Sequence, residues 1–189
     1  MGRALILVSI FVALRAPAPA CAQRGCEKKT ATVAEITIAV DDEAGECLVV
    51  EGIVMDDEGQ PVAGATVYVY HTDVDGYYAL PGNDPSVSRL CGLMLTGEDG
   101  RYRFRTIYPA SYPGGAVPRH IHYVVSGPGI ETAQFLLEFT DDPLITESRI
   151  QRDRRRHEGL EPTYHGIRPL TRDAANVLIC TRNLLVSGR

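Results

Sequence analysis

Two histidines and a few tyrosines between residues 77 and 122 have the types and spacing of a metal site. His120 and His122 are separated by one residue, and on a β-strand this spacing directs both imidazoles to the same face. Tyr112 lies on a proline-containing loop just before them, and Tyr77 and Tyr78 follow a turn after an earlier strand. A His-x-His tripeptide alone is more often a pair of surface or half-buried histidines, so the tyrosines carry the argument for a metal.

Paired phenols restrict the metal that such a site would prefer. A free tyrosine has a pKa near 10, so ionising one at pH 7 costs about 4 kcal/mol. A strong Lewis acid offsets this cost, and phenolate oxygens are hard donors that suit trivalent iron better than zinc or copper. Iron(III) with two tyrosinates and one hydroxide is also neutral, which suits a dry site. These residue types therefore indicate a mononuclear, non-haem Fe(III) centre.

The elements that must position these side chains are predicted to be β-strands. Short β-branched and aromatic runs are separated by clusters of Gly, Pro and Asp, a pattern typical of an antiparallel β-sandwich. The predicted strands span residues 47–54, 65–71, 101–105, 120–125, 132–139 and 176–186. No stretch has a convincing helical pattern. We therefore expect an all-β sandwich as the catalytic domain over residues 47–189, with both histidines on one strand.

Two segments do not fit the strand pattern. Residues 23–46 are polar apart from the run Ile36–Val40, and we expect them to wrap the core or to form an edge strand. Residues 141–172 are predicted to form a long charged loop that contains the arginine run at 152–156. Such a run is typical of a solvated loop, and contact with an anionic substrate or surface is the alternative.

Composition excludes several classes of protein. The chain has 189 residues, of which 44% are hydrophobic and 23% are charged, as in a single soluble globular domain rather than collagen, a disordered chain or a multi-span membrane protein. The net charge of −5 argues against a general nucleic-acid binder, which needs a clustered basic surface.

The N-terminus has the pattern of a signal peptide. Arg3 precedes a short apolar run over residues 4–14, and the run is followed by Ala20-Cys21-Ala22, a typical cleavage site. Residues 1–22 are therefore expected to be removed on export to the periplasm or the medium, with a lipoprotein anchored through Cys21 as the second choice. Four cysteines would remain in the mature chain, and an even number in an exported protein predicts at least one disulfide of unknown pairing. These are Cys26, Cys47, Cys91 and Cys180.

About half of the chain, from Val49 to Phe139, resembles the intradiol ring-cleavage dioxygenases of the protocatechuate and catechol type. The resemblance rests on an ordered series of short motifs, of which the set Tyr, Tyr, His-x-His is the most specific. The motifs are Gly52-Ile53-Val54-x-Asp56, Pro61-Val62-Ala63-Gly64-Ala65, Tyr70-His71-Thr72-Asp73-x-x-Gly76-x-Tyr78, Thr96-Gly97-x-Asp99-Gly100-Arg101-Tyr102-x-Phe104, Arg105-Thr106-Ile107-x-Pro109-x-x-Tyr112-Pro113 and Pro118-x-His120-Ile121-His122.

The resemblance implies a ligand set, a cofactor and a reaction. The Gly-x-Tyr pattern selects Tyr78 over Tyr77, so the implied Fe(III) ligands are Tyr78, Tyr112, His120 and His122. In such enzymes an aromatic diol binds the iron as a dianion and displaces a hydroxide and the tyrosinate that matches Tyr112. Oxygen then opens the ring between the two hydroxyl carbons and gives a muconate-type diacid. The implied partners are thus a catechol-type diol and O2. Assembly of the chain into a homo-oligomer is left as an open alternative.

One position departs from the family pattern. The family commonly has an arginine three residues before the first histidine, and this chain has Val117 there. Arg119 shares a strand face with residue 117, so it either takes over the stabilisation of negative charge or points away into a salt bridge.

The main alternative to an enzyme is a secreted transthyretin-like sandwich that binds a ligand without turnover, because such proteins also carry a Pro-Val-x-Gly-Ala strand. The remaining histidines, His71, His157 and His165, lack motif support as ligands and are expected at the surface or behind the site.

Overall fold

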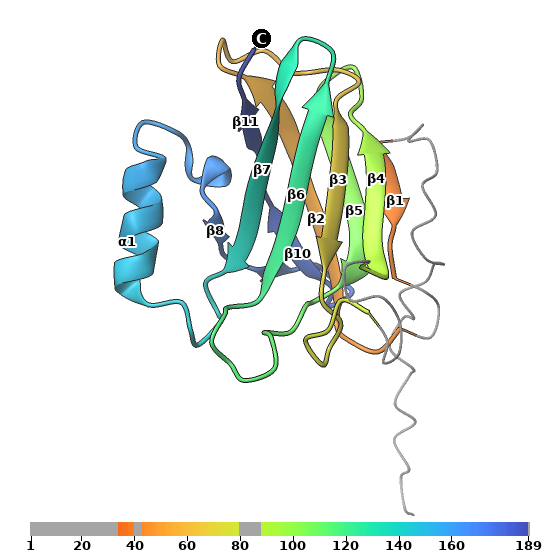
Figure 1. The fold of residues 1–189 in the computed structure, drawn as a ribbon, viewed down its shortest axis with the longest axis vertical. Coiled ribbons are helices and arrows are strands. Elements are labelled where there is room, and N and C mark those ends of the chain that lie inside the picture. The colour runs from red at the N-terminus through yellow and green to blue at the C-terminus, as the bar shows by residue number, and fades with distance from the viewer. Residues whose placement is uncertain (1–33, 40–42, 80–87, 189) are drawn as a thin grey trace, which may run out of the picture.

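A computed structural model describes residues 34–39, 43–79 and 88–188, and in this part of the chain two β-sheets pack face to face (Figure 1). The first sheet has the order β1–β5–β2–β10–β9, with β11 also paired to β2, and the second has the order β4–β3–β6–β7–β8. The strands are β1 (Glu35–Thr37), β2 (Cys47–Asp56), β3 (Thr66–His71), β4 (Leu90–Leu95), β5 (Arg101–Ile107), β6 (His120–Gly127), β7 (Ile130–Phe139), β8 (Ile167–Arg168), β9 (Thr171–Arg172), β10 (Leu178–Thr181) and β11 (Leu184–Val186). The predicted all-β sandwich is therefore confirmed.

The sheets are mixed rather than purely antiparallel. The pairs β2–β5, β3–β4, β3–β6, β6–β7 and β9–β10 are antiparallel, as the sequence predicts. The pairs β1–β5, β2–β10, β2–β11 and β7–β8 are parallel. Parallel neighbours need a crossover connection, and the strand pattern of a sequence does not reveal which strands such connections bring together.

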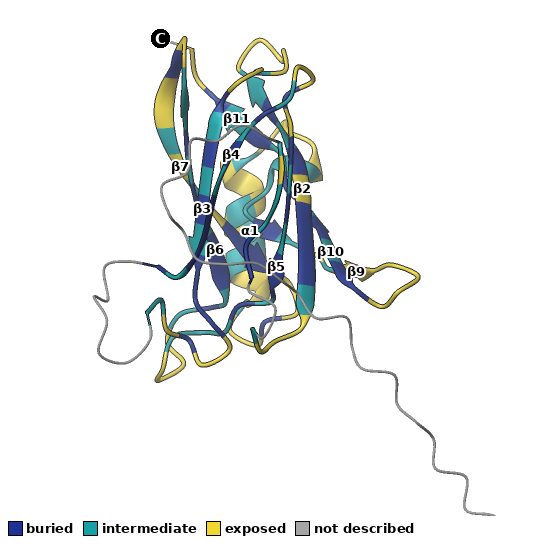
Figure 2. Cartoon of the chain, turned by 90° about the vertical axis from the view of Figure 1, so that its right-hand side faces the viewer, coloured by how far each residue is buried: buried dark blue, intermediate teal, exposed yellow. Residues whose placement is uncertain are grey.

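Aromatic rings join the two sheets in the core. Tyr102 and Phe104 on β5 and Tyr123 on β6 are fully buried. The Tyr123 ring lies edge-on to both others, with centroid distances of 6.1 Å in each case. Figure 2 shows the buried residues between the two layers. Since edge-to-face pairs add about 0.5–1.5 kcal/mol to the free energy of burial, this cluster helps to fix β6 against the opposite sheet.

The expectation that residues 141–172 form a loop without helical structure is wrong. Helix α1 (Glu147–Arg156) and a 3₁₀-helix over Pro162–Tyr164 lie in this segment. Thr146 caps α1 by accepting a hydrogen bond from the Arg149 N–H, and the basic last turn complements the helix dipole. No residue of α1 is buried, so the sequence lacks the apolar periodicity that would have revealed the helix.

Strand β4 was also missed, because its residues are almost uniformly apolar and do not alternate. At the other end, residues 35–37 form β1 at the edge of the first sheet, which favours the edge-strand alternative for that part of residues 23–46. The signal peptide predicted over residues 1–22 lies outside the described residues. Among the described residues, no helix is long and apolar enough to cross a membrane.

Two cysteines show contrasting states. Cys91 on β4 is disulfide-bonded, as predicted for at least one pair, while Cys26 lies outside the described residues. Cys180 on β10 is a buried thiol, and burial raises its pKa to about 12.

His71 at the end of β3 is a core residue rather than a surface one. Its side chain is fully buried, with Nδ1 2.8 Å from the Thr72 carbonyl and Nε2 2.7 Å from Thr106 Oγ1. Burial lowers the pKa of His71 to about 4, against the smaller opposing effects of the Thr72 carbonyl, Glu43 and Asp73, and Arg89 lowers it further. The imidazole is therefore neutral in the folded protein near pH 7.

This burial predicts a loss of stability in mild acid. Between pH 6.5 and pH 4 the unfolded chain protonates His71 and the folded protein does not, so stability falls as pH is lowered, by up to about 3 kcal/mol. Urea unfolding at pH 7 and pH 4.5 should therefore show a larger drop for the native chain than for His71→Gln, which cannot take up this proton. Equal drops in the two proteins would contradict the prediction.

Candidate metal centre

Strand β6 places both histidines on the outer face of its sheet. Ile121 and Tyr123 are fully buried in the core, and the side chains of His120 and His122 alternate with them. His120 is 6% exposed and His122 is half-buried. The predicted same-face arrangement of the pair is confirmed.

The first tyrosine loop is built around Asp73, just after β3. Its carboxylate oxygen Oδ1 accepts hydrogen bonds from the N–H groups of Asp75 and Tyr77, at 3.0 and 2.9 Å. The other oxygen, Oδ2, lies 3.2 Å from the Arg89 guanidinium. This turn ends at Tyr78 and directs its phenol towards the histidines, while Tyr77 is 54% exposed.

The second tyrosine loop is hydrogen-bonded to the first. Thr72 Oγ1 donates to the Ala110 carbonyl at 2.7 Å, and the Ala110 N–H donates to the Asp73 carbonyl at 3.1 Å. Gly76 has a φ of +85°, and a Cβ at this position would lie 2.2 Å from the Ser111 carbonyl oxygen. Only glycine allows the two loops to approach this closely, and the approach brings Tyr112 to Tyr78. Both loops lie at the end of the sheet where β6 begins (Figure 1).

Four donor atoms converge where the loops meet β6. Tyr78 Oη lies 2.6 Å from Tyr112 Oη, 3.0 Å from His122 Nε2 and 3.4 Å from His120 Nε2. His120 Nε2 lies 3.1 Å from Tyr112 Oη and 3.0 Å from His122 Nε2. Ligand atoms bound about 2 Å from one metal ion are separated by about 2.8–3.5 Å, so the cluster has the dimensions of a coordination sphere.

Neighbouring groups fix the orientation of both imidazoles. His120 Nδ1 lies 2.7 Å from the Pro118 carbonyl, which makes Nδ1 the protonated nitrogen and leaves the Nε2 lone pair facing the cluster. The Tyr70 ring stacks on His122 at 4.5 Å with an interplanar angle of 5°. The sequence motifs do not reveal this contact, which follows from the register of β3 and β6, where Tyr70 lies opposite His122.

Burial disfavours a charge on His122 and on Tyr78. Burial, together with neighbouring His120, lowers the pKa of His122 to about 4. Burial and the hydrogen bond with Tyr112 raise the pKa of Tyr78 above its usual value. A neutral His122 imidazole and a Tyr78 phenol whose proton is costly to remove are suited to a cation that supplies the missing positive charge.

Arg119 does not reach into the cluster. Its Nε lies 4.0 Å from Asp142 Oδ2, and its guanidinium lies over the Tyr108 ring at 5.1 Å. These contacts favour the salt-bridge alternative for Arg119 over a role beside the diol.

The carboxylate of Asp142, which sequence reasoning missed, is fully buried and ties down the flanks of the cluster. It accepts hydrogen bonds from the Arg119 N–H at 2.8 Å and from Ser111 Oγ at 3.5 Å. Ser111 and Arg119 directly precede Tyr112 and His120, so one carboxylate positions two of the four donor residues.

The two remaining histidines lie away from the cluster. His157 and His165 stack on each other at 5.5 Å, and the His157 Nδ1 lies 3.2 Å from the Asp153 carboxylate.

Comparison with known proteins identifies relatives. The model of the family described as Dioxygenase matches residues 18–159. The chain is 35% identical over 127 residues to hydroxyquinol 1,2-dioxygenase of Rhizobium sp. (strain MTP-10005). This alignment covers 58% of the chain and 43% of that protein. It is 38% identical over 133 residues to catechol 1,2-dioxygenase 1 of Acinetobacter lwoffii, and this second alignment covers 60% of the chain and 42% of that protein. The chain thus spans less than half the length of these curated relatives.

Solved structures share the fold. The dioxygenase domain of a carbohydrate-binding fusion protein from Streptomyces sp. SirexAA-E superposes with a TM-score of 0.61 at 23% identity, covering 92% of this chain and all of that one. The 3-chlorocatechol 1,2-dioxygenase of Rhodococcus opacus 1CP gives a TM-score of 0.64 at 22% identity, covering 84% of this chain and 67% of that one. Together with the family match over most of its length, these findings show that the chain belongs to the intradiol ring-cleavage dioxygenase family.

Proposed function

We propose that this protein cleaves catechol-type aromatic diols with O2 between the two hydroxyl carbons, at a mononuclear Fe(III) held by Tyr78, Tyr112, His120 and His122. The observation that carries the proposal is the convergence of two phenol oxygens and two imidazole nitrogens, which are linked by five contacts of 2.6–3.4 Å. Both oxygen atoms would enter the product, a muconate-type diacid, so the reaction needs no external reductant.

The donor set fits trivalent iron. Two phenolates are hard anionic donors and two imidazoles are neutral, so the protein would supply two negative charges to the metal. When bound, Fe(III) would act as a Lewis acid that makes the diol reactive towards oxygen.

The four side chains have unequal roles in this proposal. Tyr78 Oη lies within 3.4 Å of the three other donor atoms and would remain an anionic ligand when the diol binds. Tyr112 lies on the loop held by Asp142, and its Oη would accept a proton from the incoming diol as it gives up its place. The diol dianion would replace one tyrosinate and one hydroxide, its two protons passing to the Tyr112 phenol and to water, so the site would stay neutral. The two histidines, fixed by Pro118 and Tyr70, keep their positions throughout.

Iron-loaded protein should be coloured by ferric tyrosinate, and its colour and iron content should respond differently to four substitutions. His120→Ala and His122→Ala should each lower the affinity for iron more than about 100-fold. Substituting a residue that only supports a metal ligand already lowers metal affinity about 10–100-fold, and these substitutions remove the ligand itself. Tyr78→Phe should weaken iron binding, because it leaves one excess positive charge. Tyr112→Phe should retain more iron than Tyr78→Phe but lose diol binding and turnover together.

Metal analysis and visible spectra, followed by oxygen uptake with catechol, test this order. A wild-type protein that stays colourless after iron loading would contradict the proposal and favour a ligand-binding sandwich without turnover. Full iron binding by both histidine variants would contradict the assignment of the ligands.

The approach of the two tyrosine loops should depend on Gly76. Gly76→Ala introduces a Cβ that would lie 2.2 Å from the Ser111 carbonyl, so the loop that carries Tyr112 must move. We expect iron affinity to fall by at least about tenfold, with a loss of stability of about 1–3 kcal/mol from the clash.

Gly114→Ala is the matched control for this substitution. Gly114 also has a positive φ, +95°, but nothing lies within 4 Å of a Cβ there. The control should lose some stability through backbone strain, but its affinity for iron should change little. If both variants bind iron equally well, close contact at Gly76 does not position Tyr112.

We also propose that the protein is exported. The apolar run at residues 4–14 and the site Ala20-Cys21-Ala22 support this, as does the disulfide at Cys91. Protein isolated from its native cell should have the mass of a chain that begins near Gln23 and should gain free thiols on reduction. An unprocessed chain whose thiol count does not change with reductant would contradict export.

A further inference from the structure

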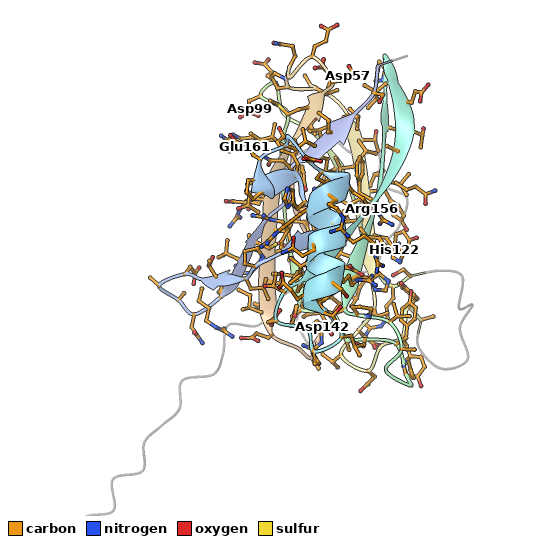
Figure 3. The ribbon with its side chains drawn as sticks, turned by 90° about the vertical axis from the view of Figure 1, so that its left-hand side faces the viewer. Asp57, Asp99, His122, Asp142, Arg156 and Glu161 are labelled. Atoms are coloured by element: carbon orange, nitrogen blue, oxygen red, sulfur yellow. The ribbon has the colours of Figure 1, made fainter. Side chains whose placement is uncertain are left out.

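The Tyr78 phenol is directed by the turn that begins at Asp73 and ends at Tyr78. Asp142, labelled in Figure 3 near the lower end of α1, supports the Tyr112 side of the donor cluster. On the Tyr78 side, the N–H groups that bind Asp73 Oδ1 close the turn only while that carboxylate keeps its position. The groups that hold the Asp73 carboxylate therefore also determine where the Tyr78 phenol lies.

Arg89, which directly precedes β4, holds this turn at both ends. Its guanidinium nitrogen Nη2 lies 3.2 Å from Asp73 Oδ2, at the start of the turn. Its backbone N–H donates to the Tyr78 carbonyl at 2.9 Å, at the other end. One residue thus joins the beginning of the turn to the residue that carries the phenol.

Glu43 orients the Arg89 side chain. Its carboxylate meets the guanidinium at two points, with Oε1 2.7 Å from Nη2 and Oε2 in contact with Nη1. Because Nη2 carries two hydrogens, it can donate to Glu43 and to Asp73 together. The planar fork of arginine suits such charge-assisted, two-point contacts. The hydrogen bond with Glu43 also raises the pKa of Arg89 above its usual value, so the cation is retained.

The two carboxylates are nearly buried, which makes them dependent on this cation. The side chains of Glu43 and Asp73 are 6% and 8% exposed, so water would compensate little for the loss of the guanidinium. Asp73 would then take up a proton or turn towards solvent. In either case it would accept less strongly from the N–H groups of Asp75 and Tyr77, and the turn would open.

The segment that carries Glu43 also packs against this turn. Gly45 has a φ of +134°, and a Cβ at this position would lie 2.9 Å from Val74 Cγ1. The Glu46 carbonyl accepts a hydrogen bond from the Tyr108 N–H at 2.7 Å, just after β5. Glu43 thus reaches Arg89 from a segment that is itself held in place by two neighbouring parts of the fold.

We propose that Arg89, oriented by Glu43, is a positioning residue that holds the Tyr78 phenol where it can bind iron. The inference rests on the proposed function for the metal, but it concerns residues outside the four donors. The pair acts through Asp73 and the turn, so its effect is on the placement of one ligand.

Substitutions of Arg89 should alter iron binding in a graded way. Arg89→Gln should lower the affinity for Fe(III) about tenfold, since substituting a residue that supports a metal ligand lowers metal affinity about 10–100-fold. At full iron loading, the visible band of ferric tyrosinate should shift, because Tyr78 meets the metal in a different geometry. Arg89→Lys keeps a positive charge between the two carboxylates and should recover part of the affinity. Glu43→Gln should shift the band in the same direction by a smaller amount.

Arg103→Gln is the matched control. Arg103 on β5 also pairs with two carboxylates, those of Glu35 and Glu51, but these ion pairs join β5 to β1 and β2. This variant should leave iron affinity and the visible band unchanged. If Arg89 were a structural residue only, Arg89→Gln would lower the free energy of unfolding and otherwise behave like this control.

A measurement on metal-free protein separates the inference from the proposed function. With tyrosine-selective isotope labelling, Tyr78→Phe identifies the NMR signal of the Tyr78 ring. This signal should move in Arg89→Gln and in Glu43→Gln but not in Arg103→Gln. An unmoved signal in folded Arg89→Gln, or in Glu43→Gln if Arg89→Gln does not fold, would overturn the inference. Absence of iron binding or of diol cleavage by the native chain would overturn the proposed function, whereas a displaced Tyr78 ring in the variants would still support the role of Arg89.

Discussion

The alternation of β6 is the constraint on which the rest of the site depends. Ile121, Tyr123 and Val125 are fully buried, and Tyr123 contacts aromatic rings of the opposite sheet. Because side chains of a strand alternate with a period of two, the free energy that buries these residues also holds His120 and His122 on the outer face. A slip of one residue against β3 would expose Tyr123 and bury both imidazoles, so the core enforces the register that the site requires. The stacking of Tyr70 on His122 is a direct product of this register.

The tyrosines depend on a different kind of order, since neither lies on a strand. Hydrogen bonds join the two loops at Thr72, Asp73 and Ala110. Together with the glycine at position 76, they hold the phenol oxygens of Tyr78 and Tyr112 2.6 Å apart. Asp142 adds a buried negative charge that holds the residues next to Tyr112 and His120. A buried carboxylate that satisfies several donors at once is costly to displace, so Asp142 holds this part of the site in place.

The sequence was sufficient for the features that have a short-range signal. The spacing of His120 and His122, the turn before Tyr78 and most of the core strands could be predicted because each depends on local periodicity or turn residues. The parallel pairs of β2 could not, since they join segments more than a hundred residues apart. Asp142 was missed for the same reason, because nothing near it in the sequence distinguishes it from a surface acid. Helix α1 was mistaken for a loop because it buries no residue, and its positions are determined by capping and ion pairs rather than by an apolar face.

Helix α1 and the core are therefore held in place by different interactions. Its attachment to the sheet depends on the ion pair between Glu138 and Arg149 and on the hydrogen bonds of Asp153, whereas the cluster of donor atoms depends on the packing of β6. Residues of α1 that take no part in these contacts, such as Arg156, can change with little effect on the buried core, because surface substitutions usually alter stability by less than about 0.5 kcal/mol. The donor cluster and helix α1 thus depend on different interactions, since core packing fixes the first and ion pairs and hydrogen bonds at the surface fix the second.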